Sequence, residues 1–240
     1  MARCAEEILK YEIEGLVLMK RIRNSLFRIF VHPVKDNGLL LGGVITLRNL
    51  INLIYNIFFL WRKHIKADFS SDIRGINYIE VGSAILGRNC RIEIIRRYNG
   101  QQFSPKLKIG NHVILNDMVH IGCANYIEIG DYCIFASRIY ISDHNHGRYK
   151  GELQSVISEP VAKRKLDAEN QVIIGKNVWL GEGVAVLPGS IIGENSIIGA
   201  NAVVNGYIPP NCIAVGIPAK VIKKFDLNSG EWIDCRLKIC

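Results

Sequence analysis

The 240-residue sequence contains no CxxC pair, although it has seven cysteines. Closely spaced cysteine pairs are typical of zinc and redox sites, and an odd number of cysteines does not suit a framework of disulfides. We therefore expect reduced thiols, as in a cytosolic protein. Cys90 and Cys133 fall at small positions of the repeat described below, which predicts that both thiols fill the core.

The N-terminal residues MARCAEEILKYEIEG are charged and include no apolar stretch followed by a cleavage site. Such a stretch is the mark of a secretory signal peptide. We therefore expect no signal peptide and a cytoplasmic location.

Acidic residues are scarce relative to basic ones, with 22 Asp and Glu against 30 Lys and Arg and a formal net charge of +8. This excess predicts an anionic partner, namely a nucleotide cofactor, a membrane surface or an acidic glycan. Nucleic acid is not expected, because the sequence has no zinc-finger spacing, aromatic ribonucleoprotein signature or basic recognition helix.

The second half of the chain follows neither the period of a helix nor that of an ordinary strand. Instead an aliphatic residue recurs at every sixth position, and a small or aliphatic residue follows each one four positions later. A period of six returns the chain to the same interior position after one short side and one corner, which describes a β-solenoid. The first set is Ile174, Leu180, Val186, Ile192, Ile198 and Val204, and the second is Val178, Val184, Ser190, Ser196, Ala202 and Ile208.

The same six-residue period appears earlier in the chain, and a weaker form of it begins at Leu86. We predict an all-β fold, a parallel β-helix of hexapeptide repeats, with coiling that begins near residue 80. The predicted organisation is a mainly helical segment over residues 1–70, the β-helix over 71–224 with an extended loop at 147–171, and a C-terminal tail over 225–240. The apolar positions of this earlier part of the repeat are Ile109, Leu115, Ile121, Ile129, Phe135 and Ile141.

Residues 1–66 lack the six-residue period and carry 11 Lys and Arg against 5 Asp and Glu. Between residues 43 and 60, Arg48 and three asparagines share one side of a helical wheel and leave a broad apolar face. This polar stripe argues against a free-standing transmembrane span. Two interpretations stay open: residues 43–66 contact the inner face of a membrane peripherally, or the apolar face packs against the solenoid or a neighbouring subunit.

The longest interruption of the repeat follows Ile141. The residues Ser142-Asp143-His144-Asn145-His146-Gly147 lead into a long segment before the period resumes at Ile173. Loops of this length in a compact domain usually act as lids or binding walls. The alternative is that both histidines simply face solvent. His112 and His120 occupy regular positions of the repeat and are expected to be wall residues.

The hexads, the His-bearing loop, the segment Asn177-Val178-Trp179-Leu180-Gly181 and the segment AVGIPAKVIKK at 214–224 together resemble the hexapeptide-repeat acyltransferases. The resemblance covers about residues 80–224. It is greatest to sugar O-acetyltransferases, both the maltose and galactoside type and the enzymes that acetylate capsule and O-antigen. It implies a homotrimeric left-handed parallel β-helix that uses acetyl-CoA and no metal.

The resemblance implies His146 as the catalytic base, His144 as the second candidate, and Asn116 as the residue that orients the acyl and acceptor groups. A sugar hydroxyl does not ionise at neutral pH, so its attack on a thioester needs a base, and imidazole suits that task. Asp143 or Glu159 is expected to orient the ring.

The acetyl-CoA contacts implied by the resemblance lie in the last coils and the closing segment, where lysines suit the phosphate charges of CoA. Two positions depart from the family pattern, because Glu182 replaces a small residue and Gly206 stands where a basic side chain often lies. Trp179 is expected either to line the active site or to be an aromatic residue of the core or of a subunit interface. The implied contacts are Glu182, Ala200, Asn205, Lys220 and Lys223.

We therefore predict an acetyl-CoA-dependent O-acetyltransferase that acts on a sugar hydroxyl of a capsule or O-antigen polysaccharide or its precursor, by direct attack on the thioester. An amino-sugar N-acetyltransferase or a xenobiotic acetyltransferase would share the fold and the base. Two other classes remain as alternatives. One is a γ-carbonic-anhydrase-like zinc enzyme, with His120, His144 and His146 as candidate ligands. The other is a non-catalytic solenoid scaffold.

Overall fold

A computed structural model describes residues 31–60 and 63–235. The first thirty residues of the predicted helical segment, Trp61 and Arg62, and residues 236–240 of the predicted tail lie outside the described residues. The chain divides into two compact units, Met1–Phe58 and Phe59–Cys240.

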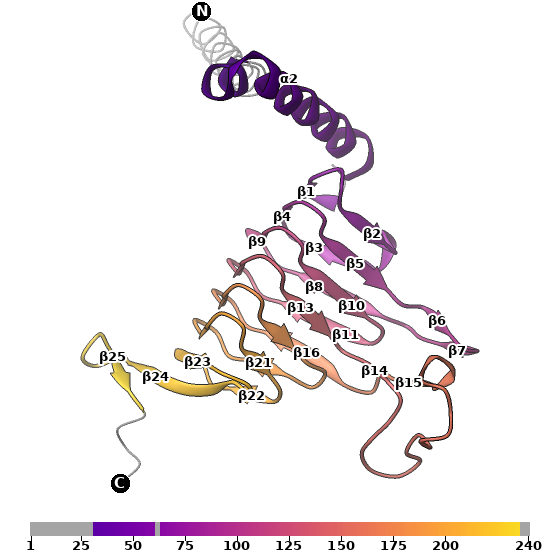
Figure 1. The fold of residues 1–240 in the computed structure, drawn as a ribbon. Helices are drawn as coiled ribbons and strands as arrows, with labels where there is room; N and C mark the ends of the chain where they lie inside the picture. The colour runs from indigo at the N-terminus through magenta and orange to yellow at the C-terminus, as the bar shows by residue number, and fades with distance from the viewer. Residues whose placement is uncertain (1–30, 61–62, 236–240) are drawn as a thin grey trace, which may run out of the picture. The chain divides into compact units, whose positions relative to one another are not determined.

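The second unit is a parallel β-helix of three sheets, named A, B and C, whose coils stack one on another (Figure 1). The chain visits the sheets in the order C, A, B and then repeats. Sheet A consists of β1 (Ile65–Ala67), β4 (Ala84–Leu86), β9 (Val113–Leu115), β12 (Ile134–Phe135), β17 (Trp179–Leu180), β20 (Ile197–Ile198), β23 (Cys212–Val215), β24 (Lys220–Asp226) and β25 (Glu231–Asp234).

Sheets B and C have six strands each, all parallel. Sheet B consists of β2 (Asp72–Arg74), β5 (Arg91–Ile94), β10 (His120–Cys123), β13 (Tyr140–Ser142), β18 (Ala185–Val186) and β21 (Val203–Val204). Sheet C consists of β3 (Ile79–Val81), β8 (Lys106–Ile109), β11 (Tyr126–Ile129), β16 (Gln171–Ile174), β19 (Ile191–Ile192) and β22 (Tyr207–Ile208). A short 3₁₀-helix, η4 (Ile76–Tyr78), precedes β3.

The hexapeptide period sets the register between coils. Ile174 on β16 pairs with Ile192 on β19, one coil of three hexads later. Every residue of the two predicted sets is buried, which confirms the predicted core. Cys90 and Cys133 are buried as expected, and burial raises the pKa of the Cys133 thiol to about 11. The parallel β-helix is therefore confirmed, and its left-handed sense stays a prediction.

Glycine and asparagine close the corners, because the corner torsions and the spacing between coils resist most side chains. A Cβ on Gly175 would lie 2.6 Å from the backbone nitrogen of Glu194 in the next coil. Asn177, Asn195 and Asn211 adopt positive φ, which asparagine tolerates better than most residues. Their side chains also form a ladder, with amide hydrogen bonds of 3.0 and 2.9 Å between successive coils.

The β-helix begins earlier than the start near residue 80 that the sequence suggested. Strand β1 already pairs in parallel with β4, residue for residue from Ile65 and Ala84. At the other end, β24 and β25 extend sheet A by antiparallel pairing and reach into the predicted tail. The six-residue period is weak in both places, because Ile65 and Ala84 are 19 residues apart and not 18, and because β24 and β25 pair antiparallel and are not coils.

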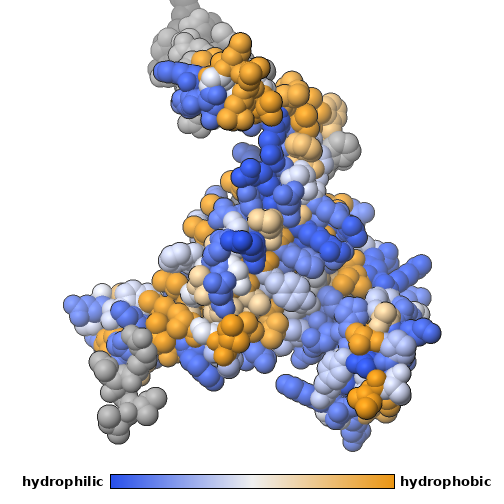
Figure 2. Space-filling model, viewed as in Figure 1, coloured by the Kyte–Doolittle hydropathy of each residue, from blue (hydrophilic) through white to orange (hydrophobic). Residues whose placement is uncertain are grey.

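The first unit contains α2 (His32–Tyr55), which continues into the π-helix η2 (Asn56–Leu60). Proline stands in the first turn of α2, where a missing N–H costs no hydrogen bond. The run His32–Phe58 is long and apolar enough to cross a membrane, judged by length and composition alone. Apolar side chains cover much of its visible surface (Figure 2), and Leu40 and Phe58 are 88% and 74% exposed.

The corners of successive coils line up as three edges, which we name CA, AB and BC after the sheets they join. Two insertions leave the BC edge and project on the same side of the coil (Figure 1). Residues 95–105 form a hairpin of β6 (Arg97–Tyr98) and β7 (Gln101–Gln102). Residues 143–170, here called the lid, contain β14 (Asn145–His146), η5 (Val161–Lys163) and β15 (Leu166–Asp167). The lid thus has secondary structure that its sequence did not predict.

Candidate active site

Asp143 and His144 form a fixed pair at the base of the lid. The Asp143 side chain is fully buried, and its two oxygens accept the backbone N–H groups of Ala124 and Asn125, each at 2.8 Å. One of these oxygens also lies 2.9 Å from Nδ1 of His144. Since the carboxylate only accepts hydrogen bonds, Nδ1 carries a proton and donates it. The other ring nitrogen, Nε2, is left with its lone pair.

The coil beneath leaves space for the His144 ring. A Cβ added to Gly122 on β10 would lie 3.2 Å from Cε1 of His144, so glycine lets the imidazole lie close to the coil. The His144 side chain is 11% exposed. Its edge can therefore be reached from solvent, while its position is set by groups of the coil.

Cys123 lies beside the same carboxylate and is a second nucleophile to consider. Burial raises the pKa of the Cys123 thiol, and the charge of Asp143 and a hydrogen bond to it raise that pKa further. Because the thiolate is the reactive form, Cys123 stays inert at neutral pH. The imidazole of His144 is the better candidate for chemistry.

His146 has a different environment. It lies on β14, is exposed, and has Nδ1 3.1 Å from the hydroxyl of Tyr98 in the hairpin. The same hydroxyl donates to the carbonyl of Ala162 in the lid at 2.9 Å. Since a phenol has one proton, Tyr98 accepts from His146 and donates to Ala162. His146 therefore joins the lid to the hairpin.

The hairpin holds the lid at further points. The Gln101 side chain makes two hydrogen bonds to the backbone of Leu166, at 3.1 and 2.7 Å, and Asn99 donates to Ala162 at 2.7 Å. Sequence reasoning missed this hairpin. The pair Asn99-Gly100 could have predicted it, because this pair is typical of two-residue hairpin turns. Both residues have positive φ in the structure.

The third predicted catalytic residue, Asn116, lies on a different edge. It follows β9 and precedes β10, which places it on the AB edge, whereas both histidines lie on the BC edge. The width of sheet B separates these edges within one chain. Glu159, the alternative partner for the imidazole, lines a cavity beneath the lid, whereas Asp143 makes the contact.

The predicted acetyl-CoA contacts lie at several places on the coil. Asn205 and Lys220 line one hollow of about 320 Å³, together with Pro218 and Ala219. An exposed lysine beside this hollow suits a phosphate-bearing donor such as acetyl-CoA. Asn205 follows β21 on the edge that carries the two histidines, whereas Lys220 is the first residue of β24 in sheet A.

The other implied contacts do not join that hollow. Ala200 and Glu182 lie on the AB edge, and the Glu182 carboxylate binds Arg138 at 2.8 Å. Trp179 stands half-exposed on the outer face of sheet A. Lys223 lies on β24, opposite Ile213.

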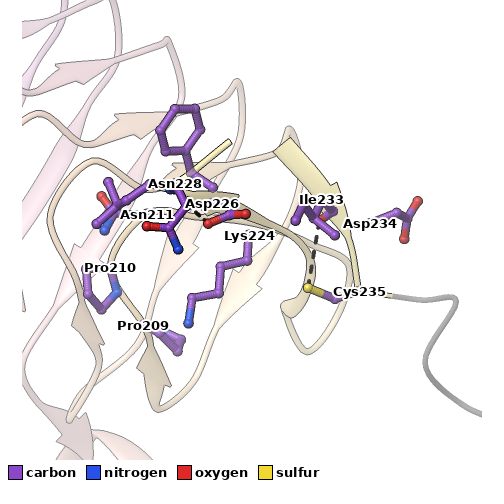
Figure 3. A pocket seen from close by; sticks show the side chains of 11 residues that line it. Pro209, Pro210, Asn211, Lys224, Asp226, Asn228, Ile233, Asp234 and Cys235 are labelled. Atoms are coloured by element: carbon purple, nitrogen blue, oxygen red, sulfur yellow. Dashed lines mark hydrogen bonds between the residues drawn. The ribbon is translucent and has the colours of Figure 1, made fainter. Parts of the chain in front are cut away.

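A further hollow, of about 580 Å³, lies on the CA edge beside the turn from Pro209 to Asn211 (Figure 3). Lys224 and Asp226 line it, as does Cys235 at the end of the described chain. Neither histidine lies on this edge. Among the described residues there is also no group of three or more His, Cys, Asp or Glu side chains placed to hold a metal ion.

Comparison with known proteins agrees with the repeat pattern. The family described as Bacterial transferase hexapeptide (six repeats) matches residues 171–206. A putative lipopolysaccharide biosynthesis O-acetyl transferase, WbbJ of Escherichia coli, is 44% identical over 123 residues, which cover 51% of this chain and 62% of that protein. The galactoside O-acetyltransferase of Lactococcus lactis is 31% identical over 156 residues, covering 64% of this chain and 69% of that protein.

Among solved structures, a mutant of AntD, an N-acyltransferase from Bacillus cereus in complex with dTDP and coenzyme A, matches with a TM-score of 0.50. The two chains are 19% identical, and the match covers 74% of this chain and 90% of AntD. At that identity the likeness concerns the fold.

The fold and the repeats define a β-helical transferase. The chain belongs to the hexapeptide-repeat acyltransferases, the family that its motifs predicted. It spans less than two thirds of the E. coli relative, and 41% of the length of a probable acetyltransferase, Rv3034c, of Mycobacterium tuberculosis.

Proposed function

We propose that this protein is an acetyl-CoA-dependent O-acetyltransferase that acetylates a sugar hydroxyl of a capsule or O-antigen polysaccharide or its precursor, with His144 as the base. The observation that carries this proposal is the contact between His144 and the buried Asp143 carboxylate, which fixes the ring and leaves Nε2 as a proton acceptor. The proposal reverses the order of the two histidines expected from the sequence.

In the proposed reaction, Nε2 of His144 removes the hydroxyl proton as the sugar oxygen attacks the thioester carbonyl. A carbon–oxygen bond forms and the carbon–sulfur bond breaks. The departing sulfur then takes the proton from His144, so the imidazole returns to its starting state. Asp143 stabilises the imidazolium between these steps, because its carboxylate faces the protonated Nδ1. Acetyl-CoA supplies the acetyl group and is a substrate.

Two observations support a cell-surface polysaccharide or its precursor as the acceptor. The E. coli relative with 44% identity is named for lipopolysaccharide biosynthesis, and the exposed apolar helix His32–Phe58 would hold the protein near membrane-bound precursors. Incubation of the full-length protein with labelled acetyl-CoA and glycans from the source cell tests the proposal. Label on a sugar oxygen is expected, whereas label on nitrogen would favour an N-acetyltransferase.

We further propose a homotrimer of left-handed coils in which neighbouring chains complete the site. Asn116 can join the histidines only from a second chain, because the AB and BC edges flank sheet B. Sheet A offers a contact surface, since outward-facing apolar residues stand in register from strand to strand along it. These residues are Ile85, Ile114, Ile134, Trp179, Ile197 and Ile213.

Ile134→Asp is expected to dissociate the trimer, because Ile134 is 45% exposed at the middle of this apolar row. A charge buried at an interface without a partner costs several kcal/mol. Sedimentation velocity should show a single chain with unchanged circular dichroism, and acetyl transfer should fall at least about a hundredfold. Ile191→Asp on sheet C, at a position that is likewise 45% exposed, is the matched control. A variant that stays trimeric would contradict this interface.

Residues 43–66 are proposed to bind the inner membrane surface peripherally. Leu47 is 59% exposed on the apolar face of α2. Leu47→Asp in the full-length protein is expected to weaken sedimentation with vesicles that contain anionic lipid by about tenfold, because burying one leucine contributes about 1.5 to 3 kcal/mol. Ile191→Asp again serves as the control. Equal binding by both variants would show that α2 does not contact the lipid.

A further inference from the structure

The lid and the hairpin line an open cavity of about 740 Å³ on the BC edge. Gln101 and Phe103 of the hairpin insertion form one wall, and the lid from Arg148 to Glu169 forms the others. Binding sites for small molecules commonly have volumes between about 300 and 1,000 Å³. The cavity is therefore large enough for one or two sugar units.

Neither His144 nor His146 lines the cavity, but backbone pairing connects the cavity wall to the segment that carries them. His146 pairs with Leu166 and Asn145 pairs with Asp167 across β14 and β15, and Leu166 and Asp167 line the cavity. The hydrogen bonds of Gln101 to Leu166 and of Tyr98 to Ala162 hold the two walls together. A ligand in the cavity would therefore lie next to the segment that carries His144 and His146.

The charge of this cavity is opposite to that of the whole chain. Three acids, Glu159, Asp167 and Glu169, line it with only two bases, Arg148 and Lys165. Arg148 forms ion pairs with Asp167 and Glu169, so its charge is already neutralised. Excess carboxylate repels an anion, and Phe103 offers a flat apolar wall.

We propose that this cavity is the acceptor site and that it accepts a neutral glycoside in preference to an acidic or phosphate-bearing sugar. The proposal rests on the proposed function and adds the class of acceptor. The excess of basic residues in the chain then lies away from the acceptor. A net charge of +6 is in residues 1–66, and Lys220 lines the hollow of about 320 Å³ that suits a phosphate-bearing donor.

Two matched probes test the charge preference, p-nitrophenyl β-galactoside and p-nitrophenyl β-galacturonide, titrated into the full-length protein with CoA present and followed by saturation-transfer NMR. The neutral glycoside is expected to bind at least about fivefold more tightly. Repulsion between the galacturonide carboxylate and one uncompensated carboxylate of the cavity weakens binding by about that factor. Equal or tighter binding of the galacturonide, or no binding of either probe, would overturn the proposal.

Two substitutions test whether the acceptor binds in this cavity. Ala168→Trp fills the cavity and is expected to weaken binding of the neutral probe at least tenfold while CoA binding, measured by calorimetry, is unchanged. Lys150→Trp adds the same side chain at an exposed lid position outside the cavity, and wild-type binding is expected. Undiminished probe binding by Ala168→Trp would place the acceptor elsewhere.

The carboxylates are tested by the double variant Asp167→Asn, Glu169→Gln, which releases Arg148 and should abolish the preference for the neutral probe. Glu80→Gln, which removes an acid from an ion pair with Lys106 on sheet C, is the control. The two proposals can fail separately. If wild-type protein acetylates a glycan and Ala168→Trp does so equally fast, the cavity proposal fails alone. If the probes bind as expected but no glycan is acetylated, the proposed function fails.

Discussion

His144→Ala is expected to lower kcat for acetyl transfer by about 10² to 10⁴, the usual contribution of a general base. The reason is geometric, because His144 is the histidine whose Nδ1 is held by a buried carboxylate and whose Nε2 is left to accept a proton. Steady-state kinetics with labelled acetyl-CoA would measure the loss. Circular dichroism would show whether the coils remain intact.

His146→Ala is the matched control for this prediction. His146 links the lid to Tyr98, so its removal should mainly raise KM for the acceptor and lower kcat by less than about tenfold. The opposite pattern, with the large loss of kcat at His146, would restore the order expected from the sequence. A loss of similar size in both variants would mean that the two histidines act as one unit.

Phe135→Ala is expected to lower the free energy of unfolding by about 3 to 5 kcal/mol. Phe135 is fully buried on β12, and its ring is the largest side chain in the centre of the coils. Neighbouring coils cannot collapse into the space that it leaves, because backbone hydrogen bonds fix the distance between them. Urea denaturation at one fixed protein concentration measures the change, since assembly makes stability depend on concentration.

Ile191→Ala is the control for the core substitution. Ile191 precedes the buried Ile192 on β19 but points outward and is 45% exposed. Its truncation should change the free energy of unfolding by no more than about 0.5 kcal/mol. Similar losses at the two positions would mean that the inside and the outside of the coil have been assigned wrongly.

The sequence predicted the coil core well because one period governs every coil. Burial at each sixth position, and again four residues later, follows from a fold in which a strand and a corner alternate. The ends of the β-helix were harder to predict. Ile65 pairs with Ala84, 19 residues later, and Ala84 pairs with Val113, 29 residues later, so the first coils do not keep the 18-residue spacing of three hexads.

The site was predicted in part. The lid was visible as an interruption of the period, and Asp143 was one of the two residues expected to orient the imidazole. The hydrogen bond from His146 to Tyr98 joins residues 48 positions apart on separate insertions, and no local pattern encodes such a pairing. The division of Asn116 and the histidines between two edges became clear only from the order of the sheets.

The placement of both insertions on one edge has a consequence for evolution. Each coil closes through its own corners and pairs only with its immediate neighbours, so a segment can lengthen at one corner without disturbing the register of the others. New versions of the hairpin and lid could thus arise by recombination, while the other coils were inherited unchanged.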